Sequence, residues 1–218
     1  MVSDDNPCPL CQSSQTQHYW QDKRRDYRQC QQCQLVYVPE AFHLSASDEK
    51  AEYDKHENSL DDDGYLTFLS RVTDPLIKLY AERGQQAKGL DFGCGPAPAL
   101  AQHMSQAGHN MAIYDLYYFP DQIVLNETYD FITCTEVIEH LAAPMEFLTW
   151  ATGHLAEDGI IAIMTKRVRD LDSFKHWHYK NDPTHICFYS EATFEWIAEN
   201  FRLTLSIINK DVVFLTRT

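Results

Sequence analysis

The sequence lacks the features that would tie it to a membrane. Its apolar runs are short and interrupted, so no stretch of about 20 apolar residues is available to cross a bilayer. The first residues, MVSDDN, have neither the basic start nor the apolar stretch of a signal peptide. Internal repeats and low-complexity segments are also missing. These absences predict a cytoplasmic protein without a membrane partner.

Basic residues are scarce as well. The chain of 218 residues contains 18 Lys and Arg against 32 Asp and Glu, which gives a net charge of −14. An acidic surface repels a phosphate backbone over roughly one Debye length, and this disfavours nucleic acid as a partner. The exception is the segment KRRDYR at residues 23–28, a basic patch that contains an aromatic side chain. This patch keeps RNA open as an alternative partner.

The cysteines are unevenly distributed. Two C-x-x-C pairs near the N-terminus are separated by eighteen residues, a spacing typical of a four-thiolate zinc site. Each pair places two thiolates about one tetrahedral edge apart, and the metal then stabilises a segment too small to have its own core. A redox pair or a disulfide is the weaker interpretation in a cytosolic chain. The sequence therefore predicts a structural zinc site with the ligands Cys8, Cys11, Cys30 and Cys33.

The chain divides into three predicted parts. Residues 1–45 form a zinc ribbon, residues 46–87 an acidic linker with a helix that packs on the core, and residues 88–218 an α/β domain. In the middle part, apolar residues recur at helical spacing. This spacing predicts a helix that ends near Gly84, with Pro75 kinking or dividing it.

Strand and helix patterns alternate through the third part. We expect strands near residues 89–92, 110–114, 129–135, 159–165, 203–209 and 212–216, and helices near residues 98–108, 144–156 and 190–200. Alternation of this kind indicates a mostly parallel α/β sheet with crossover helices. The last two strands are expected to form a hairpin, because only two residues separate them.

A glycine-rich motif, LDFGCGPA, follows the first of these strands. Gly93 and Gly95 let the backbone approach a ligand closely at the carboxyl edge of the sheet. NAD fits poorly, because Pro98 stands where a dinucleotide fingerprint has its third glycine. Asp115 ends the next strand some twenty residues later and can accept hydrogen bonds from both hydroxyls of a ribose. The two motifs together predict a nucleoside-containing cofactor.

Two carboxylates and an imidazole follow the strand at residues 129–135. If a helical turn begins there, Glu136, Glu139 and His140 lie on one face of it at i, i+3 and i+4. Such a group at the end of a strand suits a divalent cation or acid–base chemistry. Acidic residues in the first turn of a helix are also favoured by the helix dipole without any function. The residues alone leave these interpretations open.

Taken together, these motifs resemble the class I S-adenosylmethionine-dependent methyltransferases. The matching parts are the loop DFGCG at residues 91–95, Asp115, the acidic exit of the fourth strand and a fifth strand at residues 155–165. The resemblance covers roughly residues 88–218, and it implies a Rossmann-like sheet and S-adenosylmethionine as the cofactor. The cofactor-binding residues it implies are Asp91, Gly93, Cys94, Gly95, Asp115 and Cys134.

The chain departs from this family at two points. The third glycine of the motif is replaced by Ala97, a tolerable change. The segment at residues 116–128 is very short for a helix and a third strand. We therefore expect the adenine-binding wall to be rebuilt from Tyr117, Tyr118 and Phe119.

A further resemblance narrows the reaction. The pattern E-x-x-E-H at residues 136–140 is similar to that of ubiquinone-pathway O-methyltransferases and of plant-type small-RNA 2′-O-methyltransferases, which bind magnesium there. In those families a later histidine joins the metal, and His185 in the segment DPTHICFYSEATFEW corresponds to it. The resemblance implies a site for Mg²⁺ or another divalent ion with the ligands Glu136, Glu139, His140 and His185. It makes Glu139, His140 and His185 the expected catalytic residues.

The expected function is methyl transfer from S-adenosylmethionine to the oxygen of a small-molecule or protein acceptor. A divalent ion lowers the pKa of an acceptor hydroxyl, or His140 and His185 act as bases. The segment at residues 174–180 either covers the acceptor with its aromatic and basic side chains or packs as a surface loop. One alternative is an RNA methyltransferase that holds phosphates with residues 23–28. The other is a non-catalytic adaptor with a zinc ribbon on a methyltransferase-like scaffold.

Overall fold

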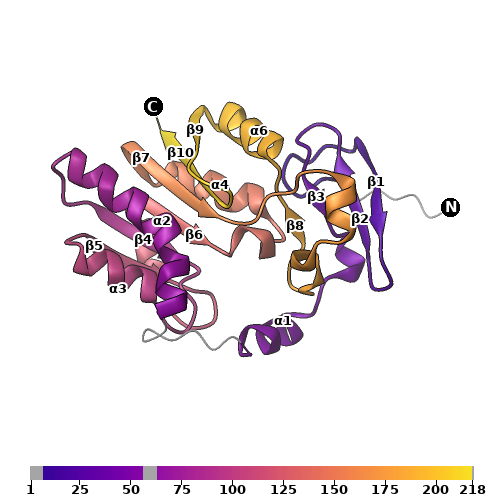
Figure 1. The fold of residues 1–218 in the computed structure, drawn as a ribbon, viewed down its shortest axis with the longest axis horizontal. Coiled ribbons are helices and arrows are strands. Elements are labelled where there is room, and N and C mark those ends of the chain that lie inside the picture. Colours follow the sequence, from indigo (N-terminus) through magenta and orange to yellow (C-terminus); the bar gives the residue numbers. More distant parts are fainter. Residues whose placement is uncertain (1–6, 56–62, 218) are drawn as a thin grey trace.

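The computed structural model describes residues 7–55 and 63–217. A large sheet with helices on both faces lies at one end of the long axis, and a small N-terminal sheet lies at the other (Figure 1). The helix α1 (Ala46–Tyr53) lies at the lower edge of this view, between the two sheets. In the part of the chain that is described, no helix is both long and apolar enough to span a membrane.

The large sheet is of the mostly parallel type that the sequence predicts. Within the described residues it consists of six strands, β4 (Lys88–Phe92), β5 (Asn110–Tyr114), β6 (Tyr129–Thr135), β7 (Leu155–Met164), β9 (Leu203–Ile207) and β10 (Val212–Arg217). Their spatial order is β5, β4, β6, β7, β10, β9. The first four are parallel, whereas β10 runs antiparallel to both β7 and β9. The expected C-terminal hairpin is therefore present.

Helices cover both faces of this sheet. The helices after α1 are α2 (Asp63–Glu82), α3 (Ala99–Gln106), α4 (Pro144–Gly153), α5 (Leu171–Lys175) and α6 (Glu191–Phe201). Successive side chains of a strand point to opposite faces. Thus Phe131 packs with the apolar residues of α2 and α3, and its neighbour Ile132 packs with those of α4 and α6. The sheet is buried between two apolar layers, as parallel sheets are.

Pro75 does not divide α2, which runs unbroken from Asp63 to Glu82. A proline inside a helix leaves the carbonyl four residues earlier without its amide partner. Here that carbonyl belongs to Arg71, and the side-chain amide of Asn209 donates to it at 3.0 Å. The sequence pattern could not show this compensation, because Asn209 lies at the far end of the chain.

The N-terminal sheet includes a strand from the C-terminal part of the chain. Its strands are β1 (Thr16–Gln21), β2 (Asp26–Cys30), β3 (Val36–Tyr37) and β8 (Cys187–Phe188), in this spatial order. In the antiparallel pair of β3 and β8, Val36 lies opposite Phe188 and Tyr37 lies opposite Cys187. The predicted ribbon at residues 1–45 thus shares a sheet with the predicted α/β domain, and one apolar core runs through both.

The segment between β5 and β6 forms no strand. Among its residues, Gln122–Asn126 form a short 3-10 helix, and β5 is left as an edge of the large sheet. The sequence-based expectation that residues 116–128 are too short for a helix and a third strand agrees with this arrangement. The wall beside β5 is consequently formed by loop residues.

Candidate active site

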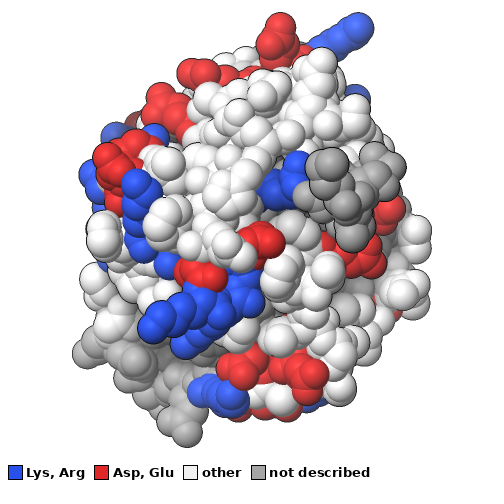
Figure 2. Space-filling view, turned by 90° about the vertical axis from the view of Figure 1, so that its right-hand side faces the viewer, with Lys and Arg blue, Asp and Glu red and all other residues white. Residues whose placement is uncertain are grey.

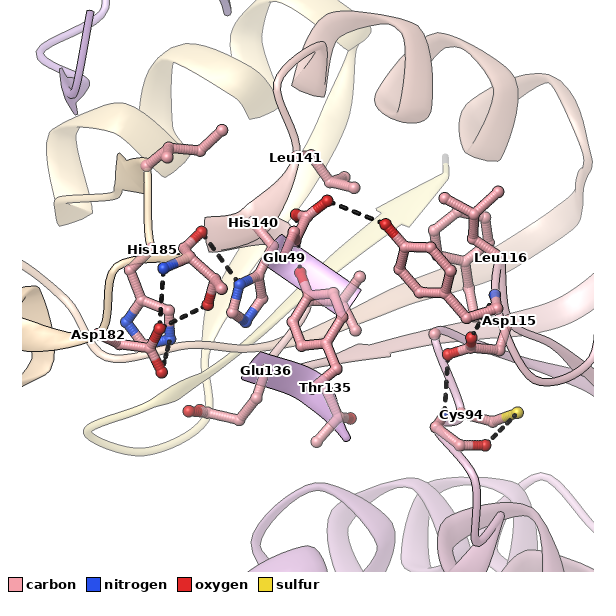
Figure 3. A pocket seen from close by; sticks show the side chains of 18 of the residues that line it. Glu49, Cys94, Asp115, Leu116, Thr135, Glu136, His140, Leu141, Asp182 and His185 are labelled. Atoms are coloured by element: carbon pink, nitrogen blue, oxygen red, sulfur yellow. Dashed lines mark hydrogen bonds and ion pairs between the residues drawn. The ribbon is translucent and has the colours of Figure 1, made fainter. Parts of the chain in front are cut away.

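A cavity of about 760 Å³ lies at the carboxyl ends of β4, β5, β6 and β7. Open α/β sheets bind their ligands at this edge. One end of the cavity, the glycine side, is lined by Gly93, Cys94, Gly95 and Asp115, and the other end, the histidine side, is lined by Glu136, His140, Asp182 and His185. In Figure 3 the labelled residues of the histidine side lie toward the left, and Asp115 and Cys94 of the glycine side lie toward the right.

The glycines at the end of β4 have backbone conformations that other residues rarely adopt. Gly93 has a φ of 76° and Gly95 a φ of 65°. A Cβ atom at Gly93 would lie 2.4 Å from a methyl carbon of Val137, so the side chain of Val137 packs directly on this residue. A Cβ at Gly95 would meet no atom within 4 Å. The loop therefore leaves open space above Gly95 for a ligand.

Asp115 connects this loop to the next one. Its carboxylate accepts hydrogen bonds from the backbone amides of Gly95 at 3.0 Å, Tyr117 at 2.9 Å and Tyr118 at 3.1 Å. The side chain is 9% exposed and lines the cavity. Its orientation is thus fixed by the backbone before any ligand binds, a role that the sequence motif did not reveal.

Two of the residues implied as cofactor ligands lie behind the cavity wall. Asp91 is 3% exposed and accepts a hydrogen bond from the hydroxyl of Thr133 at 2.8 Å. Burial raises the pKa of Asp91 to about 6. Cys134 is fully buried in the apolar core, whereas Cys94 lines the cavity. Burial raises the pKa of both thiols above the ordinary range, so neither is a ready nucleophile.

Two of the three residues expected to form the adenine wall line the cavity. Tyr117 and Tyr118 line the glycine side of the cavity, and Phe119 pairs through its backbone with Asp115. The phenol of Tyr117 donates to Glu49 at 3.0 Å, and that of Tyr118 donates to Asp54 at 2.7 Å. Both acceptors lie in or next to α1, so these two tyrosines attach that helix to the rim of the cavity.

The exit from β6 is not the α-helical turn that the sequence predicts. Glu136 has a left-handed φ of 52°, and the next residues form a 3-10 helix, Ile138–His140. This geometry breaks the i, i+3, i+4 alignment on which the expected common face depends. Glu136 and His140 line the cavity, whereas Glu139 is 0% exposed and points into the protein.

Three of the expected metal ligands nevertheless converge. One ligand atom each of Glu139, His140 and His185 lies within 4.8 Å of the others, and Glu136 is outside this group. Nδ1 of His185 lies 2.8 Å from the carbonyl oxygen of Tyr179, and Nδ1 of His140 lies 3.2 Å from that of Thr184. Since a carbonyl only accepts, both Nδ1 atoms carry the hydrogen and both Nε2 atoms offer a lone pair. Burial lowers the pKa of His185, against the opposing charge of Asp182.

Tyr179 is a member of this side that the sequence analysis did not single out. Its hydroxyl lies within hydrogen-bond distance of Glu139 and of Glu136, the latter at 3.1 Å. Burial raises the pKa of Glu136 to about 7, and burial together with the charge of Glu136 raises the pKa of Glu139 to about 8. Among the described residues, Oε1 of Glu136 and Oε2 of Glu139 have no hydrogen-bond partner.

Aromatic side chains enclose the histidine side. The ring of Tyr53, from α1, lies edge-on to His140 with the ring centres 5.3 Å apart. Lys166, at the end of β7, lies 5.0 Å from the ring centre of Tyr179, and both residues line the cavity. Of the segment at residues 174–180, only Tyr179 lines the cavity in the described structure, and Phe174 is buried in the core.

The four paired cysteines lie together at the base of the N-terminal sheet. Sγ of Cys8 lies 3.5 Å from that of Cys33, and Sγ of Cys11 lies 3.4 Å from that of Cys30. All four sulfur atoms lie within 4.8 Å of one another. A tetrahedron with Zn–S bonds of about 2.3 Å has edges of about 3.8 Å, whereas a disulfide bond measures about 2.05 Å. The distances fit a zinc tetrahedron and exclude disulfides.

The two C-x-x-C turns have the same local structure. Gln12 and Gln34, which follow Cys11 and Cys33, have left-handed φ angles of 59° and 60°. In each turn the amide of the glutamine donates to the carbonyl of the first cysteine, at 2.9 Å from Cys8 and 3.1 Å from Cys30. The backbone thus places the four thiols in two turns of matching structure.

The basic segment at residues 23–28 does not form a free basic surface. Arg25 is 6% exposed and donates to the carbonyl oxygens of Lys180 and Asp182. The guanidinium of Arg28 donates to the hydroxyl of Thr16 at 3.2 Å. On the face drawn in Figure 2, the largest group of basic side chains has acidic side chains beside it, and the other basic side chains lie in smaller separate groups. The patch on which the RNA alternative depends is therefore mostly engaged within the protein.

Residues 65–205 match the family model described as "Methyltransferase domain". The match covers more than half of the chain, so the protein belongs to this family of methyltransferases. The expected class of enzyme, an S-adenosylmethionine-dependent methyltransferase with a Rossmann-like fold, is thereby confirmed. No curated protein matches the sequence.

Solved structures share the fold. Magnesium protoporphyrin IX methyltransferase of Synechocystis PCC 6803, with bound S-adenosylhomocysteine, is 15% identical with a TM-score of 0.51 over 81% of this chain and 96% of that chain. An O-methyltransferase family protein of Burkholderia thailandensis is 13% identical with a TM-score of 0.50, over 82% and 64%. The plantazolicin methyltransferase BpumL, in complex with a pentazolic desmethylPZN analog and S-adenosylhomocysteine, is 16% identical with a TM-score of 0.50, over 79% of this chain and 90% of that chain.

Proposed function

We propose that this methyltransferase transfers a methyl group from S-adenosylmethionine to an oxygen atom of a small-molecule or protein acceptor. One observation carries the proposal: ligand atoms of Glu139, His140 and His185 converge, and the two histidines line the same cavity as the glycine loop and Asp115. A methyl donor on the glycine side would place its transferable group toward the histidine side. The acceptor oxygen would then be activated there.

The glycine side suits the proposed cofactor. The open space above Gly95 would receive the methionine part, and the carboxylate of Asp115 would accept hydrogen bonds from the ribose. Because three backbone amides already orient Asp115, little conformational entropy is lost when the ribose binds. Tyr117 and Tyr118 would contact the adenine ring. Cys134 and Asp91, which are buried behind the cavity wall, would support the glycine loop without touching the cofactor.

The histidine side suits a divalent ion. The Nε2 atoms of the two imidazoles and Oε2 of Glu139, which has no hydrogen-bond partner among the described residues, would hold it. Mixed nitrogen and oxygen ligands accept Mn, Fe, Co or Zn more readily than Mg, which prefers oxygen. A bound ion would lower the pKa of the acceptor hydroxyl. Glu136, with a pKa raised to about 7 and a place on the cavity wall, would accept the proton.

A metal-free version of the same reaction uses the histidines alone. Each Nδ1 is held by a backbone carbonyl, so Nε2 of His140 or His185 is the proton-accepting atom. Burial lowers the pKa of His185, and this favours the neutral form that a base requires. Asp182, whose Oδ2 lies 3.8 Å from Nε2 of His185, would stabilise the protonated ring.

Elemental analysis separates the two versions and tests the zinc proposal. We propose that the four cysteines hold one structural zinc ion, so the purified protein should contain one zinc per chain. After addition of Mn²⁺, the wild type should retain one manganese per chain and Glu139→Ala should retain none. Glu146→Ala, which removes an exposed carboxylate from α4, is the matched control and should behave like the wild type. A wild type that binds zinc but no added ion would exclude the metal version.

A further inference from the structure

The segment at residues 178–188 carries Tyr179, Asp182 and His185, and the N-terminal sheet holds its C-terminal end. Its last residues form β8, which pairs with β3. Just before β8, the amide of Val38 donates to the carbonyl of Ile186 at 2.8 Å. The amide of Ile186 in turn donates to the carbonyl of Glu139 at 2.9 Å, so this stretch joins the N-terminal sheet to the histidine side.

Arg25 lies in the turn between β1 and β2, and its side chain holds the first part of the same segment. Its Nη2 donates to the carbonyl of Lys180 at 2.6 Å and to that of Asp182 at 2.7 Å, and its Nη1 donates to the carbonyl of Pro183 at 3.1 Å. Its Nε donates to the hydroxyl of Tyr27 at 3.0 Å. The planar guanidinium thus fixes three carbonyls of one loop at once, which a lysine ammonium cannot match in geometry.

The contacts around Arg25 lead back to the cysteine cluster. Tyr27 is fully buried in β2 and donates to Asp22, whose carboxylate lies 3.6 Å from Nζ of Lys180. The strand β2 ends at Cys30, and β3 follows Cys33 closely. A tetrahedral ion at the cysteines would therefore fix the relative position of the two strands that grip the segment.

We infer that Arg25 is a positioning residue for the histidine side and that the cysteine ribbon is the frame that carries it. The ribbon's place in the enzyme is then to hold Asp182 and His185 against the cavity rather than to bind nucleic acid. The inference rests on the proposed function only in giving His185 a catalytic role. The residues that touch the acceptor or ion are His140, His185 and Glu139, and Arg25 acts through the loop.

Hydrogen exchange measured by mass spectrometry on the full, zinc-loaded chain tests this inference. The variants are Arg25→Met, Arg25→Lys and, as the matched control, Lys23→Met, which removes an exposed lysine from the same hairpin. In Arg25→Met, amides of residues 178–188 should exchange at least about tenfold faster, while amides of residues 89–101 remain protected. The exchange rate in Arg25→Lys should fall between those of Arg25→Met and the wild type, and Lys23→Met should match the wild type. If Arg25→Met does not fold, the exchange of residues 178–188 in Arg25→Lys decides whether the inference stands.

Two further readouts separate positioning from general stability. Binding of S-adenosylhomocysteine, measured by calorimetry, should change less than about threefold in every variant, whereas Mn²⁺ affinity should fall about tenfold in Arg25→Met. Unchanged exchange in residues 178–188, or an equal increase in both segments, would overturn the inference. A wild type that binds no Mn²⁺ would count against the proposed metal alone, because the exchange comparison needs no ligand.

Discussion

The two sides of the cavity are built in opposite ways. On the glycine side, the carboxylate of Asp115 is satisfied by three backbone amides of neighbouring loops. On the histidine side, the buried carboxylate of Glu139 and the half-buried one of Glu136 lie beside one phenol, and one oxygen of each has no partner among the described residues. The backbone therefore fixes the carboxylate of the first side, whereas side-chain contacts only partly engage those of the second.

This difference indicates that the carboxylates of the histidine side lower the stability of the folded protein. Buried carboxylates without full hydrogen bonding destabilise a fold, and their raised pKa values report that cost. Groups of this kind persist where a ligand or a proton must be handled. The glycine side can therefore be shared among enzymes that use one cofactor, whereas the histidine side carries what is particular to this protein.

The largest expected effect breaks the glycine side. Asp115→Ala should weaken binding of S-adenosylhomocysteine about 100-fold, because hydrogen bonds to a charged carboxylate contribute about 1.5–3 kcal/mol each and each 1.4 kcal/mol is tenfold. Calorimetry measures this, with Asp121→Ala, an exposed carboxylate of the next loop, as the control. Mn²⁺ binding should be unaffected. Unaltered cofactor affinity in Asp115→Ala would reject the ribose assignment.

The second effect concerns the histidine side, which a change at the distant cysteine cluster should weaken. Cys30→Ser should remove the zinc ion and loosen β2 and β3, so that Mn²⁺ affinity falls about tenfold while affinity for S-adenosylhomocysteine stays within about threefold. Cys94→Ser, which changes an isolated thiol on the glycine side, is the control and should keep its zinc. Equal losses on both sides would argue that the ribbon stabilises the whole protein.

The third effect is a pH dependence of stability. The pKa of Glu139 in the folded protein is raised to about 8, so between its unfolded value and pH 8 the folded state binds more protons than the unfolded state. Stability of metal-free protein should therefore fall as pH rises through this window, by up to about 1.4 kcal/mol per pH unit. Denaturant unfolding at pH 5 to 8 measures it. Glu139→Gln should flatten the curve, and a curve of unchanged slope would contradict the assigned shift.

The smallest effect concerns the phenol between the two carboxylates. The hydrogen bond from Tyr179 favours the charged form of Glu139, so Tyr179→Phe should raise the pKa of Glu139 further. Mn²⁺ must displace that proton, and its affinity near pH 7 should fall about threefold. Calorimetry at pH 7 and pH 9 checks this, because the difference should shrink at the higher pH. A loss that is the same at both pH values would indicate a packing defect.

The contrast between the two sides also describes what the sequence could predict. The strands of the large sheet and the glycine loop come from contiguous patterns, and the structure places them within a few residues of the expected bounds. The strands β4 and β5 are followed directly by Gly93, Gly95 and Asp115. Their convergence at one edge of the sheet is therefore dictated by the fold. These local motifs predicted a nucleoside-containing cofactor, and the family resemblance that they carry implied S-adenosylmethionine.

The histidine side depends on contacts that no local pattern records. Arg25 and Lys180 are joined across 155 positions, and the two-residue strand β8 is too short to show a strand pattern. Glu136 has a left-handed conformation, which is uncommon for a non-glycine residue and which the sequence did not predict. Its side chain lies outside the group of converging ligand atoms. Tyr179 is one of several aromatics in its segment, and only the fold selects it.

The most direct measurement is the ¹³C NMR signal of S-adenosylmethionine labelled at its methyl carbon and bound to the zinc-loaded protein. If one cavity holds the methyl donor on the glycine side and a divalent ion on the histidine side, one equivalent of paramagnetic Mn²⁺ should broaden the bound methyl signal in the wild type. The signal should stay sharp with Mg²⁺ and in His185→Ala. A sharp methyl signal in wild-type protein that binds both S-adenosylmethionine and Mn²⁺ would contradict a shared site.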